Sequence, residues 1–350
     1  MPELPEVETV RRQLSEVLPG QTITNIQVLS EKSFQGDPSL ISPSTVSDIR
    51  RAGKVLIIDL ETGNVKLETG NRHPTDTDKY RPQPALESNS FSLVIHLKMT
   101  GQLIYDSATD ITSHSDDVDS KFDHRIVGGH PTKDFIAELP SSHTRVIFTL
   151  SDFAQTSSRL SPKQRGGHDL TPSTSKLNYL YFNDQRKFGW IKLVLTSEVE
   201  KIPFIAKLGP EPWEISLENW NKLLASSRKA VKVRLLDQDK VAGIGNIYAN
   251  DALWEAQIHP SRPANSLSPQ ESELLLEKVK LVMDEGIYYG GATAADGKYV
   301  DIGGLGGSYQ EHFRTYDRAG QPCKRPDCDG IIQKITLGGR GTYFCPDCQQ

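Results

Sequence analysis

The hydrophobic period of the chain changes once, near Ile202, and this change separates two parts of different architecture. Before it, short apolar or alternating segments bounded by turn residues are typical of β-strands. These segments are 55–60, 91–97, 145–151, 179–182 and 191–195. After it, apolar residues recur at helical spacing, and 350 residues are enough for two domains. The sequence therefore predicts a multidomain α+β protein whose strand-rich part is a β-sandwich or barrel.

Local signals predict individual helices in both parts. Apolar residues recur at helical spacing from Glu6 to Leu18, and Gly20 follows, so an amphipathic helix is expected before the strands. In the second part, the capping box Ser268-Pro-Gln-Glu271 precedes a helix that includes 274–283. Gly286 is expected to mark the far end of that helix.

Two polar stretches, at about 63–90 and 106–142, interrupt the strand-rich part and are interpreted as surface insertions or mobile loops. A third polar stretch lies near 155–175. The second stretch has eight acidic and three basic residues, so its net charge of −5 equals that of the whole chain. The remainder is neutral overall, and its basic residues can still gather on one face, so the net charge does not exclude a polyanionic partner.

The four cysteines of the chain form one tight cluster near its end, Cys323, Cys328, Cys345 and Cys348. Two short cysteine pairs separated by a glycine-rich segment predict a β-hairpin ribbon that binds zinc tetrahedrally, the alternative being four unrelated thiols. Because four thiolates leave no open coordination position, we expect one structural Zn²⁺ and no metal catalysis. Arg340, just before the second pair, is expected on the hairpin, within reach of a phosphate.

A second anion site is predicted where Val241-Ala-Gly-Ile-Gly-Asn246 leads into a helix over 247–257. Asn246 is the expected N-cap, and amides exposed at a helix start bind phosphate. Lys232 and Arg234, upstream on another helical segment, would add positive charge. A plain glycine-rich turn is the alternative.

Membrane and export signals are not found. The chain has no run of ~18 apolar residues that would span a membrane. Its first ten residues, MPELPEVETV, include carboxylates and no apolar core of a signal peptide. A cytosolic protein without membrane association is therefore expected.

Nine motifs, in order along most of the chain, resemble the formamidopyrimidine-DNA glycosylase family of bacteria, also called MutM. They are Met1–Thr9, Arg51–Lys54, His96–Gly101, Asp184–Gly189, Leu208–Pro212, Leu235–Tyr248, Ile258–Pro260, Gly290–Gly291 and Cys345–Gln349. The resemblance implies an N-terminal helix on a β-sandwich (1–200), a helix–two-turn–helix domain (201–310) and a zinc ribbon (311–350). It also implies a base-excision repair enzyme that binds damaged double-stranded DNA between its domains.

The resemblance assigns chemistry to the N-terminus. Pro2, exposed once Met1 is removed, would attack the sugar C1′ as a Schiff-base nucleophile, since an α-amino group has a pKa near ~8. Glu3 would act as the general acid. Lys54 and Arg340 would complete the catalytic set near the lesion and its phosphate, with Glu6 in support. From the residues alone, Pro2 is better explained as a residue tolerated before a helix, and Glu6 could equally be a carboxylate that complements the helix dipole.

The same resemblance assigns DNA contacts. Met99, Arg186 and Phe188 would fill the gap left by an extruded nucleotide, whereas core packing is the alternative for Met99 and Phe188. Phosphates would be contacted by a second group, Lys232, Asn246 and Arg340. The implied activity is the removal of oxidised purines, such as 8-oxoguanine and formamidopyrimidines, followed by β,δ-elimination at the resulting abasic site.

Several departures from the family pattern leave alternatives open. The first cysteine pair encloses four residues where two are usual, and Ala295 replaces an expected arginine before the lesion-capping loop, 297–310. The competing functions are an endonuclease VIII-like glycosylase for oxidised pyrimidines and a non-catalytic protein that binds damaged DNA. A monomer located at the bacterial nucleoid in the cytoplasm is expected.

Overall fold

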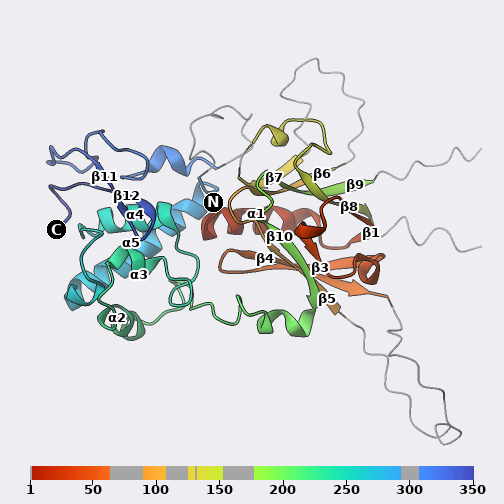
Figure 1. Ribbon diagram of the computed structural model, residues 1–350, viewed down its shortest axis with the longest axis horizontal. Helices are drawn as coiled ribbons and strands as arrows, with labels where there is room; N and C mark the ends of the chain where they lie inside the picture. Colours follow the sequence, from red (N-terminus) through yellow and green to blue (C-terminus); the bar gives the residue numbers. More distant parts are fainter. Residues whose placement is uncertain (1, 64–89, 108–124, 131, 153–176, 293–306) are drawn as a thin grey trace, which may run out of the picture.

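The computed structural model describes residues 2–63, 90–107, 125–130, 132–152, 177–292 and 307–350, and the statements below concern these residues. A strand-rich half and a helix-rich half lie side by side, and the hairpin β11–β12 lies on the helix-rich half (Figure 1). Residues 297–306 of the lesion-capping loop, most of the first polar stretch, the whole third polar stretch and Ala295 lie outside the described residues. No described helix is long and apolar enough to cross a membrane.

The strand-rich half is one ten-stranded sheet in the order β2-β10-β5-β4-β3-β1-β8-β9-β6-β7. Its strands are β1 (Gln21–Val28), β2 (Phe34–Gln35), β3 (Ser44–Ala52), β4 (Val55–Thr62), β5 (Ser90–His96), β6 (Gly101–Asp106), β7 (Arg125–Gly129), β8 (Thr144–Asp152), β9 (Asn178–Asp184) and β10 (Trp190–Leu195). Strand β1 pairs with both β3 and β8 and so joins strands β2, β10, β5, β4 and β3 to strands β8, β9, β6 and β7. Apolar side chains from these two groups of strands share one core, as in a β-sandwich.

The second polar stretch is not wholly a loop, contrary to expectation. Residues Arg125–Gly129 form β7, which pairs with β6 at the edge of the sheet. Phe135 is fully buried in a small cluster with Val127 and Tyr181. Composition failed here because a few apolar residues inside a polar segment are enough to attach it to a sheet edge.

Helix α1 (Leu4–Val17) begins two residues before its expected start and connects the two halves. At its first turn, the carboxylate of Glu6 accepts a hydrogen bond from the backbone amide of Glu3 at 2.7 Å, which is one half of a capping box. Leu4 belongs to the apolar core of the helix-rich half, whereas Val10 and Leu14 belong to the sandwich core. One helix thus places its first turn against the second domain while its later turns cover the sheet.

The helix-rich half contains α2 (Leu217–Ala225), α3 (Val231–Leu235), α4 (Asn246–Glu255) and α5 (Pro269–Tyr288). The predicted capping box of Ser268 and Glu271 starts α5, as expected. Gly286 does not end this helix, which continues to Tyr288. A Cβ atom at Gly286 would lie 2.4 Å from Cε1 of Tyr248, so the glycine is required for packing against α4.

The predicted hairpin is present as β11 (Gln333–Leu337) and β12 (Arg340–Phe344), joined by a turn at Gly338 and Gly339 with positive φ. It packs on α4, where the backbone amide of Tyr343 donates to Oδ1 of Asn250 at 3.0 Å. The ribbon is therefore held by the helical domain and not by a flexible connection alone.

Candidate active site and metal centre

Four residues of two sequence motifs, Met1–Thr9 and Arg51–Lys54, lie close together between the two halves of the molecule. We call this group the interdomain site, and its members are Pro2, Glu3, Glu6 and Lys54. Pro2 and Glu3 immediately precede α1, and both are buried. Lys54 comes from the turn between β3 and β4. The site therefore exists only when the sheet and the helical domain are packed together.

Glu3 occupies the start of α4. Its Oε1 accepts a hydrogen bond from the backbone amide of Ile247 at 3.0 Å. A Cβ atom at Gly245 would lie 2.0 Å from Cδ of Glu3, so the carboxylate needs a glycine there. The expectation for this helix start was partly wrong: Gly245, not Asn246, is the N-cap, and a carboxylate of the protein itself is bound at this end.

Burial raises the pKa of Glu3, and the nearby charge of Glu6 raises it further, whereas Lys54 and the Ile247 amide oppose the rise. Its side chain is only 2% exposed. Among the described residues, no group hydrogen-bonds to its buried Oε2. A carboxyl group with a raised pKa and one unoccupied oxygen is suited to deliver a proton.

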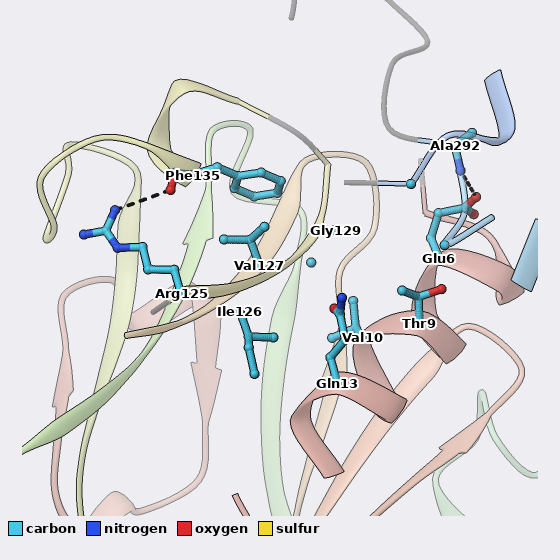
Figure 2. Close-up of a pocket in the computed structure, with 13 residues that line it drawn as sticks. Glu6, Thr9, Val10, Gln13, Arg125, Ile126, Val127, Gly129, Phe135 and Ala292 are labelled. Atoms are coloured by element: carbon cyan, nitrogen blue, oxygen red, sulfur yellow. Dashed lines mark hydrogen bonds between the residues drawn. The ribbon is translucent and has the colours of Figure 1, made fainter. Parts of the chain in front are cut away.

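Glu6 is held by three donors from three segments. Its Oε2 accepts from the backbone amide of Glu3 at 2.7 Å. Its Oε1 accepts from the hydroxyl of Tyr248 at 2.7 Å and from the amide of Ala292 at 2.8 Å. Figure 2 shows the contact with Ala292 at one end of a cavity of about 170 Å³. Glu6 thus has far more partners than a carboxylate that only complements a helix dipole.

The ammonium of Lys54 donates to the carbonyl of Ile244 at 2.9 Å, which joins the sheet to the loop before α4. Gln238 donates to the same carbonyl and accepts from the amide of Gly243, so it shapes this loop. Burial lowers the pKa of Lys54, Glu3 opposes the fall, and Arg340 adds to it. Gln238 was not singled out in the sequence, because an amide inside a polar loop carries no distinctive spacing.

The three predicted phosphate contacts gather around β12. The carbonyl of Gly341 accepts from Nζ of Lys232 at 2.9 Å and from Nδ2 of Asn246 at 3.1 Å. Lys232 is fully buried, so here it anchors the hairpin and does not face solvent, contrary to a direct phosphate contact. Arg340 is exposed next to it. Of this set, Arg340 is the cation accessible to a ligand.

The other predicted group lies apart, on two neighbouring loops. We call Met99, Arg186 and Phe188 the exposed loop group. Met99 is 39% and Phe188 55% exposed, so core packing does not explain these apolar side chains. The Arg186 guanidinium carbon lies 5.2 Å from the Phe188 ring centroid.

Buried Asp184 holds the two loops together, a role that the sequence did not reveal. It accepts from the Thr100 hydroxyl on one loop and from the amides of Arg186 and Gly189 on the other. Lys98 and Lys187, one in each loop, have positive φ values of 54° and 56°. Such strained backbone persists where surrounding contacts enforce it and is frequent at binding sites.

The four cysteine sulfurs lie within 4.8 Å of one another. The Sγ atoms of Cys323 and Cys348 are 3.8 Å apart, and those of Cys328 and Cys345 are 3.6 Å apart. A tetrahedron with Zn–S bonds of ~2.3 Å has S···S edges of ~3.8 Å, so the set fits one Zn²⁺ despite the longer first pair. The indole N–H of Trp254 donates to Cys323 Sγ at 3.2 Å. Bound zinc would hold the ribbon closed, with no position for a substrate.

The fold and these two sites define a class: a two-domain nucleic-acid enzyme with a buried carboxyl group beside its N-terminus and a zinc ribbon. Three family descriptions match in order. They are the formamidopyrimidine-DNA glycosylase N-terminal domain (residues 1–191), the H2TH domain of the same enzymes (208–297) and the zinc finger found in FPG and IleRS (320–350). The chain belongs to the formamidopyrimidine-DNA glycosylase family, and its ribbon binds one structural Zn²⁺.

Individual relatives agree with this membership. The formamidopyrimidine-DNA glycosylase of Pelotomaculum thermopropionicum is 34% identical, covering 100% of this chain and 99% of its own. That of Desulfitobacterium hafniense strain DCB-2 is 32% identical, covering 100% of both. A crystal structure of Lactococcus lactis Fpg with DNA containing an abasic site is similar in fold, with a TM-score of 0.68, 28% identity and 100% coverage of both chains.

Proposed function

We propose that this protein excises oxidised purines from duplex DNA through the amine of Pro2 and then cleaves the strand at the resulting abasic site. As a family member it is a DNA glycosylase of base-excision repair. One observation carries the residue assignment: Pro2 directly precedes a buried Glu3 whose pKa is raised, with Lys54 facing the same carboxylate. A nucleophile and an acid are thereby adjacent in the chain.

The chemical steps follow from these groups. The unprotonated amine of Pro2 forms a bond to C1′ of the damaged nucleotide while the C1′–N bond to the base breaks, and the proton that the amine loses neutralises the departing base. Glu3 transfers a proton to the sugar ring oxygen as the ring opens, which leaves an iminium between Pro2 and C1′. The iminium acidifies the C2′ proton, whose removal expels the 3′ phosphate by β-elimination. A δ-elimination then expels the 5′ phosphate.

We infer that the exposed loop group enters the duplex when the damaged nucleotide leaves it. Met99 and Phe188 offer apolar surface to replace lost stacking, and Arg186 offers donors to an orphaned cytosine. Arg186→Ala is expected to reduce the preference for a lesion opposite C, measured as excision rates with each of the four opposing bases. An unchanged preference would remove Arg186 from this role.

The remaining inferences concern the phosphate contact, the domain boundaries, the oligomeric state and the cellular location. Arg340, and not buried Lys232, is inferred to be the main phosphate contact of the β12 hairpin. Domain boundaries are inferred near 200 and 310, since β10 ends at Leu195 and α2 begins at Leu217. We infer a monomer that acts in the bacterial cytoplasm at the nucleoid, because the similar proteins are bacterial and the neighbours bind DNA.

Borohydride trapping on duplex DNA with 8-oxoguanine opposite C tests the proposal. We expect a covalent adduct with protein whose intact mass shows that Met1 is absent. Pro2→Gly should reduce the yield strongly, and retained Met1 should abolish it by blocking the amine. If protein without Met1 forms no adduct, or if Pro2→Gly traps at full yield, the assignment fails.

Oxidised pyrimidines are the alternative substrate class that one neighbour suggests. The Lactococcus lactis Fpg, 28% identical to this chain, has been crystallised with DNA that contains an oxidised pyrimidine. Comparing the release of 8-oxoguanine and thymine glycol from otherwise identical duplexes decides between the classes. Faster release of thymine glycol would favour the endonuclease VIII-like alternative.

A further inference from the structure

Tyr248 is a fully buried residue of α4 to which the proposed chemistry assigns no part. Its hydroxyl donates to Oε1 of Glu6 at 2.7 Å. Its ring packs against Tyr309 with centroids 4.9 Å apart and contacts Gly286 so closely that any Cβ there would clash. Because the ring is fixed by α5 and by Tyr309, the hydroxyl has little freedom to turn away from Glu6.

The carboxylate that receives this bond connects two segments of the site. Through Oε2, Glu6 holds the backbone amide of Glu3 at the start of α1. Through Oε1, it also holds the amide of Ala292, next to Gly291, where a Cβ would lie 2.7 Å from Cγ of Glu6. Ala292 forms an isolated antiparallel β-bridge with Ser308, and we call this bridged pair the Ala292–Ser308 neck.

We propose that Tyr248 is a positioning residue, whose hydroxyl fixes the Glu6 carboxylate in the one orientation that holds Glu3 and the Ala292–Ser308 neck together. The inference rests on the proposed function and extends it, because it names the group that orients Glu3 for proton transfer. Three directional donors restrain the carboxylate closely. Loss of the hydroxyl leaves one backbone amide on each oxygen, so the carboxylate can tilt further from its present orientation.

The charged groups around Glu6 determine what its movement would change. Among the described residues, Glu3 faces it from the same helix end and Lys54 faces it from the β3–β4 turn. The charge of Glu6 contributes to the raised pKa of Glu3. If Glu6 turns away, that contribution shrinks, the pKa of Glu3 falls, and Glu3 loses its proton at a lower pH.

Tyr248→Phe tests the proposal, because it removes the hydroxyl and keeps the ring. We expect kcat for base excision to fall about tenfold to a hundredfold, since small displacements of a catalytic group have effects of this size. KM for the damaged duplex should stay unchanged, because Tyr248 is buried. The basic limb of the kcat–pH profile should move to lower pH.

Tyr309→Phe is the matched control, since it removes a neighbouring buried hydroxyl that hydrogen-bonds with Asp251 and Arg314 and not with Glu6. It should leave kcat and the pH profile as in the wild type. In a Glu6→Gln background, Tyr248→Phe should add little, because the two changes disrupt one interaction. Equal effects of the two tyrosine variants, or lower stability without a shifted pH profile, would overturn the proposal.

A measurement without catalysis separates this inference from the proposed function. In protein labelled with ¹³C at glutamate carboxyls, the titration of Glu3 should move to lower pH in Tyr248→Phe and not in Tyr309→Phe. Exchange of the Ala292 amide proton should become faster in the same variant. If the wild type excises nothing, the proposed function fails, and these two readouts still confirm or refute the positioning role.

Discussion

The interdomain site and the exposed loop group have opposite relations to water. In the interdomain site, ionisable side chains are buried, with Glu6 7% and Lys54 6% exposed. In the exposed loop group, the apolar side chains of Met99 and Phe188 are exposed. Each arrangement has a cost in the free protein, because charges lose hydration in the first and apolar surface contacts water in the second.

Different interactions hold the two groups in place. Paired donors and acceptors hold the interdomain site, so a change there should affect chemistry and stability together. Asp184 holds the loop backbones, while the exposed side chains contribute little to folding. Changes in the exposed loop group should therefore affect activity on DNA and leave stability nearly unchanged.

The largest expected effect is that of Glu3→Gln in the interdomain site. Gln keeps an acceptor for the Ile247 amide but cannot deliver a proton, so base excision should slow by about 10²–10⁴-fold. Affinity for damaged duplex, measured by fluorescence anisotropy, should change little. Excision within a few-fold of the wild-type rate would remove Glu3 as the acid.

Gly286→Ala tests the packing behind the interdomain site. The added methyl group would lie 2.4 Å from the Tyr248 ring, and relief of this overlap should reduce the free energy of unfolding by about 1–3 kcal/mol. Denaturant unfolding monitored by circular dichroism measures the loss. The control is Ala225→Gly in α2, which reports the ordinary cost of an alanine–glycine exchange in a helix. Gly339→Ala would not serve as a control, because the φ angle of Gly339 is positive. A stability equal to wild type would show that α4 and α5 can separate freely.

Phe188→Ala should separate activity from stability in the exposed loop group. Loss of one stacking ring should slow excision from duplex DNA about tenfold. The free energy of unfolding should change by less than about 0.5 kcal/mol, because the ring is 55% exposed. A large loss of stability would contradict the contrast between the two groups.

The last comparison concerns the pH dependence of stability that Lys232 contributes near the interdomain site. Burial lowers its pKa to about 7 in the folded protein, below its ordinary value of 10.5. Between these two values the unfolded chain binds more protons, so this contribution to stability rises as the pH increases from about 7 to about 10.5. Lys232→Met should flatten that rise in urea unfolding curves recorded with zinc present. An identical pH dependence in the variant would mean that Lys232 titrates normally.

Much of the fold was predictable because its signals are local. The capping box at Ser268 and Glu271, the alternation in 91–97 and the glycines between the cysteine pairs each depend on neighbouring residues. The failures have non-local causes. In sequence, Gly286 looks like the end of a helix. In the structure, the ring of Tyr248, 38 positions earlier in the chain, leaves no room for a side chain at this position.

The candidate site divides in the same way. Family motifs predicted roles for Pro2, Glu3, Glu6 and Lys54, but they did not indicate that Glu3 would occupy the start of α4 in place of an external anion. Motifs also named Lys232 as a phosphate contact, whereas the structure buries it against β12. Asp184 and Gln238 were missed because their partners come from distant segments or from backbone amides, which leave no residue pattern.

By itself, the sequence determined the zinc ligands, the two-part architecture and the types of chemical group at the N-terminus, because spacing and residue type act over a few positions. The tertiary structure alone decided which of these groups are buried, which are paired and which meet water. Burial and pairing depend on how α1, α4 and the β3–β4 turn pack, and such long-range contacts set the proton affinity of Glu3 and the exposure of Phe188.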